Sequence, residues 1–394
     1  MDITCTEPAQ QLTAQIDVSE ERFTAHLRSH MHIYFPELNT ASTTVRLIDH
    51  AVRQYSQLLQ YELTDGSFSR QAIYKIPFSL HDAARGSTSP EERPRLFSVV
   101  NPVSNGLREY RALKSVEDHF SSLNETRFGV IAILALIESP FVLVMEKCPD
   151  PDMKTLLKTS TRFHRHQDTE MLNCAFANTG AWLNEFHTLP ALEHTEHRHK
   201  DRACYADAVN RFTTGLIQKT GNRGFFEELR QRLTETATNI LPAEVPGAVI
   251  HGDFAPRNIL VRSDSRITVF DTQRRWHAPL YEDLAYLLMS IKLAGPQVRS
   301  HGAVFSQRQL ATWESAFLSG YFQNSPIPLA AVRLYECLLM LEWWAAINFR
   351  QSKGNLKQRI SLMMSNRYVS RHVKRLLSDI EFAKAEGTGT GTAS

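Results

Sequence analysis

The chain has 394 residues, of which 42% are hydrophobic and 22% charged, so it is long enough to form two folded units that each bury a core. A net charge of +2 gives no general attraction to nucleic acid or to an anionic membrane. The five cysteines are odd in number and widely spaced, which argues against a disulfide framework or a zinc site and indicates a reducing, cytoplasmic environment. The first residues lack the basic and apolar segments of a signal peptide, and no apolar run approaches the roughly 18 residues of a transmembrane helix.

The N-terminal part of the chain changes from a helical to a strand pattern. Residues 1–40 are predicted to be an N-terminal extension with one helix around Glu20–Tyr34. From Thr43 onward, short apolar runs separated by turns predict three consecutive strands, at 43–48, 56–63 and 71–76. Lys75 lies on the third strand. The first turn, at 50–56, contains no glycine, so its backbone would approach a phosphate group less closely than a glycine-rich loop does.

A long loop, a helix and two further strands follow. Residues 77–105 are rich in proline, glycine and charge and are predicted to form a long mobile loop. The next helix begins at Gly106, has apolar residues at helical spacing and carries Glu109 on its flank. Two apolar strands, at 130–137 and 141–145, then lead to Glu146 and Cys148 and to a proline-rich segment. This ending predicts a hinge and a domain boundary near residue 149.

Residues 248–271 place polar side chains at the ends of short apolar runs. Asp253 and Asn258 follow the first run, and Asp271 follows the third. The pattern predicts a short hairpin with these three side chains at its rim. Asp253 is placed to accept a proton, while Asn258 and Asp271 offer the hard oxygens that Mg²⁺ prefers. Phosphoryl transfer from ATP requires such a set, although His251-Gly252-Asp253 taken alone is also compatible with a turn that carries a solvated carboxylate.

The order of these motifs resembles the aminoglycoside phosphotransferase and choline kinase family, a small-molecule branch of the protein-kinase-like fold. The resemblance rests on His251-Gly-Asp253-x4-Asn258, on Asp271 at the end of a strand, and on Asp283 in Tyr-Glu-Asp-Leu-Ala-Tyr. Protein kinases have H-R-D and D-F-G at the corresponding places, whereas this chain has His-Gly-Asp and Asp-Thr-Gln. The resemblance implies an α+β, two-lobed fold with a small antiparallel-sheet N-lobe and a larger, mainly helical C-lobe. It covers 43–288 by motif order.

The resemblance also implies a role for each motif residue. Asp253 would orient the acceptor hydroxyl, and Asn258 with Asp271 would hold Mg²⁺. Four further residues would serve the nucleotide: Lys75 braced by Glu109 at the phosphates, and the backbone around Glu146 and Cys148 at the adenine edge. Two would support the loop, His251 by a hydrogen bond near Asp271 and Asp283 by anchoring the loop backbone. The implied cofactors are ATP, with GTP as the alternative, and Mg²⁺, and the implied assembly is a monomer or homodimer.

The second half of the chain is predicted to be helical, with helices at 153–157, 169–189, 205–217, 225–240, 281–294, 307–323 and 328–349. His187 is interpreted as a packed or hydrogen-bonded residue rather than a catalyst, and the histidine-rich stretch 193–200 as a solvated loop rather than a metal site. The Trp343–Trp344 pair favours packing over a sugar-stacking platform. The resembled family walls its acceptor pocket with helices from these regions, so the acceptor itself is not named by any motif.

Residues 345–378 contain no Asp or Glu but many basic side chains: Arg350, Lys353, Lys357, Arg359, Arg367, Arg371, Lys374 and Arg375. A solvated helix face is the first interpretation of such a block. The alternatives are an anionic acceptor or peripheral contact with acidic lipid headgroups. Arg274 and Arg275, just after Asp271, also favour an anionic acceptor and argue against a polycationic aminoglycoside.

Three hypotheses follow for the chain as a whole, which divides into an N-terminal extension (1–40), an N-lobe (41–148), a C-lobe (149–386) and a disordered tail (387–394). The leading one is a small-molecule kinase that phosphorylates a hydroxyl of a sugar, an amino alcohol or an antibiotic. The second is a kinase of a lipid-linked or polymeric glycan, and the third a catalytically silent binding module, which only the glycine-free turn supports. A P-loop phosphotransferase is excluded because no G-x4-G-K-[ST] motif occurs.

Overall fold

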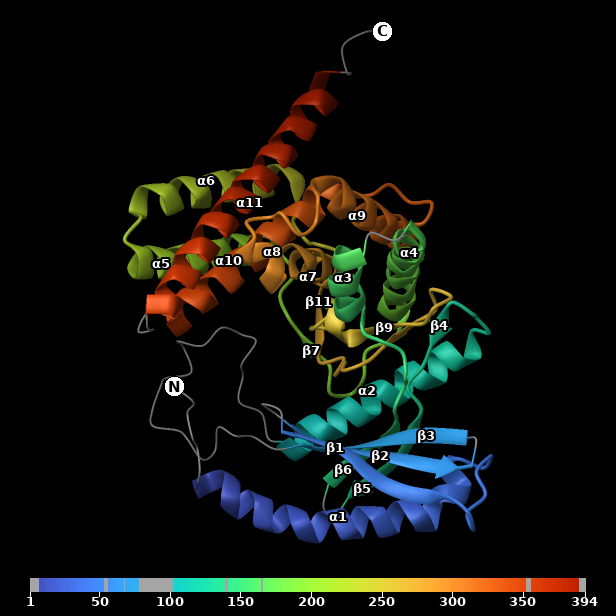
Figure 1. Ribbon diagram of the computed structural model, residues 1–394. Coiled ribbons are helices and arrows are strands. Elements are labelled where there is room, and N and C mark those ends of the chain that lie inside the picture. The colour runs from blue at the N-terminus through green and yellow to red at the C-terminus, as the bar shows by residue number, and fades with distance from the viewer. Residues whose placement is uncertain are drawn as a thin grey trace. The chain divides into compact units, whose positions relative to one another are not determined.

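The computed structural model describes residues 7–52, 56–66, 68–77, 102–138, 141–163, 166–351 and 356–389. The chain divides into two compact units (Figure 1). The first contains the chain up to Asn124 together with Val130–Pro149, and the second contains Glu125–Gly129 and everything from Asp150 onward. Most of the predicted loop 77–105, the turn residues 53–55 and the last five residues lie outside the described part.

The first unit is built on a five-stranded antiparallel sheet with the order β1-β2-β3-β6-β5. Its strands are β1 (Thr44–Val52), β2 (Ser56–Asp65), β3 (Phe68–Pro77), β5 (Ile133–Glu138) and β6 (Phe141–Glu146). The turn between β2 and β3 is the one that the sequence predicts, and Gly66 has a φ of +55° there, in the left-handed region that glycine adopts without strain. The strands are longer than their apolar runs because the hairpin ladder continues through polar residues.

Two helices cover this sheet, and Figure 1 shows them on opposite sides of it. Helix α1 (Glu7–Tyr34) places Phe23, Leu27 and Met31 against the sheet, at a spacing of four that keeps them on one helix face. They share a core with side chains that alternate along β2, such as Tyr61. Helix α2 (Pro102–Ser122) contacts β3, β5 and β6. The segment predicted as an extension therefore supplies part of the core of the first unit.

The second unit contains two small sheets and most of the helices. The sheets have the orders β4-β10-β9 and β7-β11-β8. Their strands are β4 (Phe128–Gly129), β7 (Glu196–His197), β8 (Gly247–Ile250), β9 (Ile259–Val261), β10 (Ile267–Val269) and β11 (Trp276–Pro279). The predicted three-run hairpin is thus divided, because only β9 and β10 pair with each other, whereas β8 pairs with β11.

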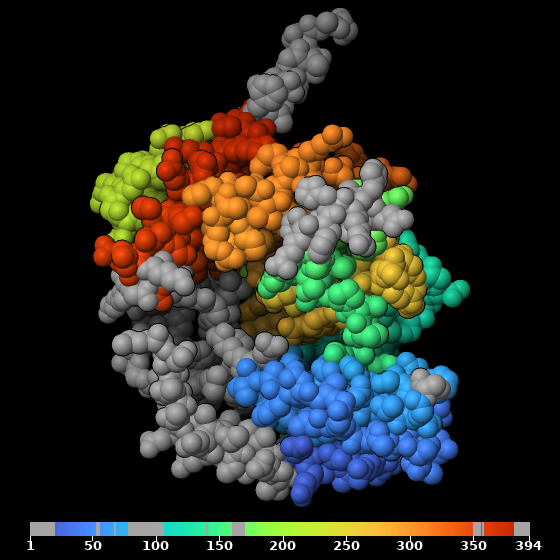
Figure 2. Space-filling model, in the orientation of Figure 1, coloured from blue at the N-terminus to red at the C-terminus, as the bar shows by residue number. Residues whose placement is uncertain are grey.

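The helices of the second unit are α3 (Met153–Phe163), α4 (His166–Thr188), α5 (Arg202–Thr220), α6 (Arg223–Ile240), α7 (Tyr281–Lys292), α8 (Gly295–Arg299), α9 (Gln307–Phe322), α10 (Leu329–Gln351) and α11 (Leu356–Gly389), with a short 3-10 turn, η3, at Pro256–Asn258. Helix α11 forms part of the surface of this unit (Figure 2). The predicted α+β fold, with an antiparallel-sheet lobe and a mainly helical lobe, is confirmed. In the described part of the chain, no helix has the length and apolar character needed to cross a membrane.

Candidate active site

The loop after β8 is held by His251. Gly252 has a φ of +84°, and this left-handed turn brings the backbone N–H of Asp253 to within 3.3 Å of Nδ1 of His251. The buried imidazole ring hydrogen-bonds through Nε2 to the backbone oxygen of Phe270, at 3.0 Å. Because Nδ1 accepts, the ring carries its proton on Nε2. His251 therefore ties the loop after β8 to the residue that precedes Asp271.

Asp283, in the first turn of α7, anchors the backbone of the same loop. One carboxylate oxygen accepts from the backbone N–H of His251 at 2.6 Å, and the other accepts from that of Gly252 at 3.0 Å. His187 donates to the carboxylate at 3.1 Å, and the hydroxyl of Tyr321 in turn lies 2.8 Å from the other ring nitrogen of His187. Burial alone would raise the pKa of Asp283, but the His187 hydrogen bond, the charges of His187 and His251 and the Gly252 N–H together lower it.

Asp253 lies in the loop with its carboxylate partly exposed. One oxygen pairs with Arg257, and the other accepts from Nδ2 of Asn258 at 3.0 Å. The same amide nitrogen also donates to the backbone oxygen of Asp253 at 2.9 Å. On α7, burial, followed by the charge of Asp253, raises the pKa of Tyr286 to about 12. The Asp253 carboxylate is thus surrounded by three polar side chains, those of Arg257, Asn258 and Tyr286.

Asn258 and Asp271 lie at the same end of the β9–β10 hairpin. The backbone N–H of Phe270 donates to the backbone oxygen of Asn258 at 3.1 Å, which puts Asp271 one residue beyond that link. Asp271 is exposed and has a φ of +66°, a left-handed conformation that Asp tolerates better than most residues. Nδ2 of Asn258 makes both hydrogen bonds of its side chain, so Oδ1 remains as a hard oxygen at the end of the hairpin that leads to Asp271.

This donor set fits Mg²⁺, which is commonly held by one or two protein oxygens together with phosphate oxygens and water. The described residues contain no group of three or more His, Cys, Asp or Glu that could hold a metal by themselves. The predicted set of one amide and one carboxylate does not require such a group.

In the first unit, Lys75 on β3 and Glu109 on α2 form an ion pair. Nζ of Lys75 lies 2.6 Å from Oε1 of Glu109, and the side chains are only 17% and 9% exposed. Glycine at position 106 permits this approach of α2 to the sheet, because a Cβ there would lie 2.4 Å from the ring of Phe141. A shielded ion pair of this kind holds the lysine side chain in one direction.

Glu146 and Cys148 lie where β6 leaves the sheet. The backbone N–H of Glu146 donates to Ala132, and that of Lys147 to Gln71, so the strand ends in a fixed backbone conformation. Burial raises the pKa of the Glu146 carboxyl, although the charge of Arg70 opposes the shift. Cys148 carries a half-buried thiol that is not part of a disulfide.

The structure corrects one inference about charge. Arg274 is buried, with 1% of its surface exposed, and it donates to the backbone oxygen of Pro190. Burial lowers the pKa of Arg274 to about 10. It is therefore a structural residue and cannot meet an acceptor directly. Arg275 pairs with Glu196 and lies over the ring of Trp276, 4.3 Å from its centroid.

Three residues around the motif were not identified as part of the site from the sequence. Arg257 sits between Asp253 and Asn258, at a position that the motif leaves unspecified, so the motif gives no signal for its contact. Tyr286 follows Asp283 by three residues on α7, a spacing that puts both on one helix face. His187 was predicted to be packed or hydrogen-bonded, which is confirmed, but its partner Asp283 was not foreseen.

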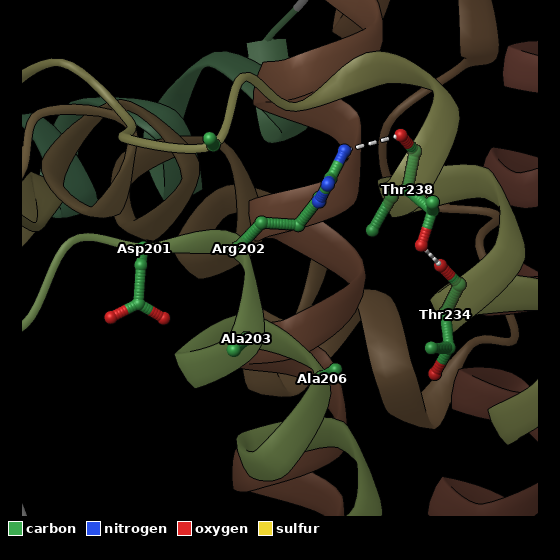
Figure 3. Close-up of a pocket in the computed structure, with 8 residues that line it drawn as sticks. Asp201, Arg202, Ala203, Ala206, Thr234 and Thr238 are labelled. Atoms are coloured by element: carbon green, nitrogen blue, oxygen red, sulfur yellow. Dashed lines mark hydrogen bonds between the residues drawn. The ribbon is translucent and has the colours of Figure 1, made fainter.

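The hollow drawn in Figure 3 lies between α5 and α6 and has a volume of about 270 Å³. Arg202 crosses it to the backbone oxygen of Thr238 at 2.7 Å, and Asp201 caps α5 by accepting from Cys204. Asp201 thus caps the start of α5, and Arg202 links α5 to α6. None of the residues that line this hollow belongs to the catalytic motif.

Comparison with known proteins agrees with the motif. Residues 142–324 match the phosphotransferase enzyme family. A solved structure from Ralstonia eutropha, provisionally assigned as an aminoglycoside phosphotransferase, is 12% identical, covers 91% of this chain and 98% of its own, and has a TM-score of 0.55. A spectinomycin phosphotransferase in complex with ADP and spectinomycin (12%, 91% and 98%, TM-score 0.47) and a choline kinase from Streptococcus pneumoniae (13%, 90% and 99%, TM-score 0.43) are also similar. A search of curated proteins finds no match.

The fold and the matched region define an enzyme that transfers phosphoryl groups. The region 142–324, which matches the phosphotransferase enzyme family, contains His251, Asp253, Asn258, Asp271 and Asp283. The kinase-like fold, the resemblance to this family and the class of enzyme are thereby confirmed.

Proposed function

We propose that the enzyme transfers the γ-phosphoryl group of ATP to a hydroxyl of a small molecule in the presence of Mg²⁺. The observation that carries this proposal is a continuous hydrogen-bond network among the motif residues of the second unit. Asp283 holds the loop backbone, His251 joins that loop to Phe270, and Asn258 joins Asp253 to the hairpin that ends at Asp271. Kinases require this combination of an orienting carboxylate and adjacent hard oxygens.

In the proposed reaction, the acceptor oxygen forms a bond to the γ-phosphorus while the bond to the β–γ bridging oxygen breaks and ADP leaves. Asp253 orients the hydroxyl and receives its proton late, because a loose transition state demands little basicity. Asn258 and Asp271 would hold Mg²⁺, and the bound ion would neutralise part of the negative charge of the phosphates. Lys75, directed by Glu109, would contact the phosphates, and the backbone at Glu146–Cys148 would contact the adenine.

The acceptor is proposed to be a sugar, an amino alcohol or an antibiotic with an anionic group. Arg257 is the reason for proposing an anionic group on the acceptor. Its side chain is exposed, and it pairs with Asp253, the carboxylate that would orient the acceptor hydroxyl. When Asp253 turns to the hydroxyl, Arg257 would be released to pair with an acceptor anion. A polycationic aminoglycoside would meet repulsion from this arginine, so the acceptor class of the Ralstonia eutropha protein is not transferred to this chain.

A screen for acceptor-dependent ATP consumption tests the proposal. The panel would contain matched neutral, anionic and cationic alcohols: free sugars and sugar acids, choline-like amines, aminoglycosides, macrolides and nucleoside antibiotics. We expect turnover with a member of the panel and a preference for anionic members. Asp253→Asn should lower kcat by about 10²–10⁴-fold and leave Mg-ATP binding in place, because the substitution removes the orienting charge but no phosphate contact.

Three outcomes of this screen would contradict the proposal. Unchanged turnover in Asp253→Asn would mean that another residue orients the hydroxyl or that the activity comes from a contaminant. Nucleotide binding without turnover on any acceptor, including a glycolipid presented in vesicles, would favour the catalytically silent alternative. Turnover on the glycolipid alone would favour the second candidate, a kinase of a lipid-linked glycan, for which the exposed face of α11 is the supporting observation.

A further inference from the structure

Helix α11 presents a continuous row of side chains to solvent, here called the α11 stripe. Its members are Leu356, Ile360, Met363, Arg367, Arg371 and Lys374. The separations of four, three, four, four and three residues keep the row on one helix face. The three apolar members at the start of the helix are 72%, 47% and 64% exposed, and the three basic members are exposed as well.

The opposite face of α11 fixes the outward direction of the stripe. Tyr368, Val369, Val373 and Leu377 are buried on that face, and the hydroxyl of Tyr368 donates to the backbone oxygen of Lys292 at 2.8 Å. Figure 2 shows α11, in red, on the outside of the second unit. The stripe is thus an exposed surface rather than a part of the core.

The basic members of the stripe are not neutralised by carboxylates within the described chain. Arg371 contacts His301 at 3.1 Å, and Lys374 lies 4.9 Å from the ring centroid of Phe225. The sequence has no Asp or Glu between Glu342 and Asp379. An apolar row thus continues along the helix into a row of uncompensated positive charge.

We propose that the α11 stripe docks the enzyme on an anionic lipid bilayer. Leu356, Ile360 and Met363 would enter the boundary between headgroups and acyl chains, while Arg367, Arg371 and Lys374 would contact lipid phosphates. A helix lying on the surface in this way does not cross the membrane. The proposal goes beyond the phosphotransferase activity and does not depend on it.

Two other occupants fit the stripe less well. A symmetric dimer through this face would bring the same basic residues of two copies together. Nucleic acid could bind the basic side chains through its phosphates, but it would leave the apolar side chains of Leu356, Ile360 and Met363 without a partner. An anionic bilayer is the surface that satisfies both halves of the stripe.

Vesicle sedimentation of the full chain tests the proposal, with vesicles of phosphatidylcholine alone or mixed with phosphatidylglycerol. We expect binding to the mixed vesicles that weakens as salt is added, and little binding to the neutral ones. Replacing the basic members (Arg367→Gln, Arg371→Gln, Lys374→Gln) should weaken binding by roughly 100-fold, since each lipid-facing charge contributes about fivefold. Replacing the apolar members (Leu356→Ser, Ile360→Ser, Met363→Ser) should weaken it by at least roughly 10-fold.

The matched control removes the same charge from exposed arginines elsewhere: Arg46→Gln, Arg223→Gln and Arg308→Gln. Circular dichroism and thermal melting would verify that every variant is folded. Equal loss of binding in the control and the basic stripe variant would overturn the proposal, because the attraction would then be general. Binding to neither kind of vesicle, or a stripe-dependent dimer without lipid binding, would overturn it as well.

Discussion

Asp283 is a buried carboxylate whose hydrogen bonds all stabilise its ionised form. Two backbone N–H groups and His187 donate to it, and no water-exposed surface competes for these bonds because the residue is 1% exposed. Such a group contributes both to the stability of the second unit and to the position of Asp253, which directly follows the anchored residues His251 and Gly252.

We predict that Asp283→Asn lowers the free energy of unfolding by about 2–3 kcal/mol at about pH 5, because the hydrogen bonds to a charged acceptor are weakened or lost. The folded-state pKa is depressed below 3.8, so the contribution of Asp283 is present above the unfolded-state pKa and is lost as pH falls through the folded-state value. The difference between wild type and variant, measured by urea unfolding, should therefore shrink below about pH 4. A difference that stays constant into strong acid would contradict this assignment.

The sequence predicts the residues of the candidate site because the motif has a fixed order: the loop after β8, the β9–β10 hairpin and the first turn of α7. His251, Asp253, Asn258, Asp271 and Asp283 have the contacts described above, and the ion pair of Lys75 with Glu109 is present at 2.6 Å. Their roles in turnover remain predictions.

Burial and side-chain contacts could not be identified in the same way. Arg274 and Arg275 are neighbours with the same charge, yet one is buried and the other lies on Trp276. Charge in a sequence does not report burial, which depends on the strands and loops that come together from distant positions.

At the level of elements, α4 and α9 cross at a pair of glycines. A Cβ on Gly180 would lie 2.0 Å from the backbone oxygen of Phe317, and one on Gly320 would lie 2.0 Å from that of Ala177. These glycines allow the backbones of the two helices to touch, and the crossing positions His187 and Tyr321 to meet near Asp283.

Gly180→Ala should lower the free energy of unfolding by about 1–3 kcal/mol or more, because the methyl group clashes with backbone that cannot move aside without separating the helices. Gly224→Ala in α6 is the matched control, since nothing lies within 4 Å of its added Cβ. The control should leave stability unchanged or raise it by up to about 1 kcal/mol. Thermal or urea unfolding of both variants gives the comparison, and equal behaviour of the two would refute the close crossing.

Several long periodic helices could be predicted from the sequence, whereas the two-residue strands could not. The helices α4 to α7, α9 and α10 fall close to their expected positions because an amphipathic pattern repeats over several turns. The two-residue strands β4 and β7 and the partner of β8 are set by pairing between distant segments. Such pairing leaves no local periodicity in the sequence.

At the level of the whole molecule, the proposed function assigns nucleotide-binding roles to residues of both units. Lys75 belongs to the first unit, and Asp271 belongs to the second. A ligand that binds only the folded state raises stability by about 2.7 kcal/mol at a concentration one hundred times its dissociation constant. Loss of this stabilisation on substitution therefore reports which residues take part in binding.

The most direct test is the thermal shift produced by Mg-ATP in wild type, Lys75→Met and Asp271→Ala, with Asp264→Asn as a control for an exposed acid on the β9–β10 turn. We predict that Mg-ATP raises the melting temperature of wild type and of the control, that chelation of Mg²⁺ removes most of the increase, and that each of the two site variants loses most of it. A full Mg-ATP shift in either Lys75→Met or Asp271→Ala would contradict the proposal that this residue takes part in Mg-ATP binding.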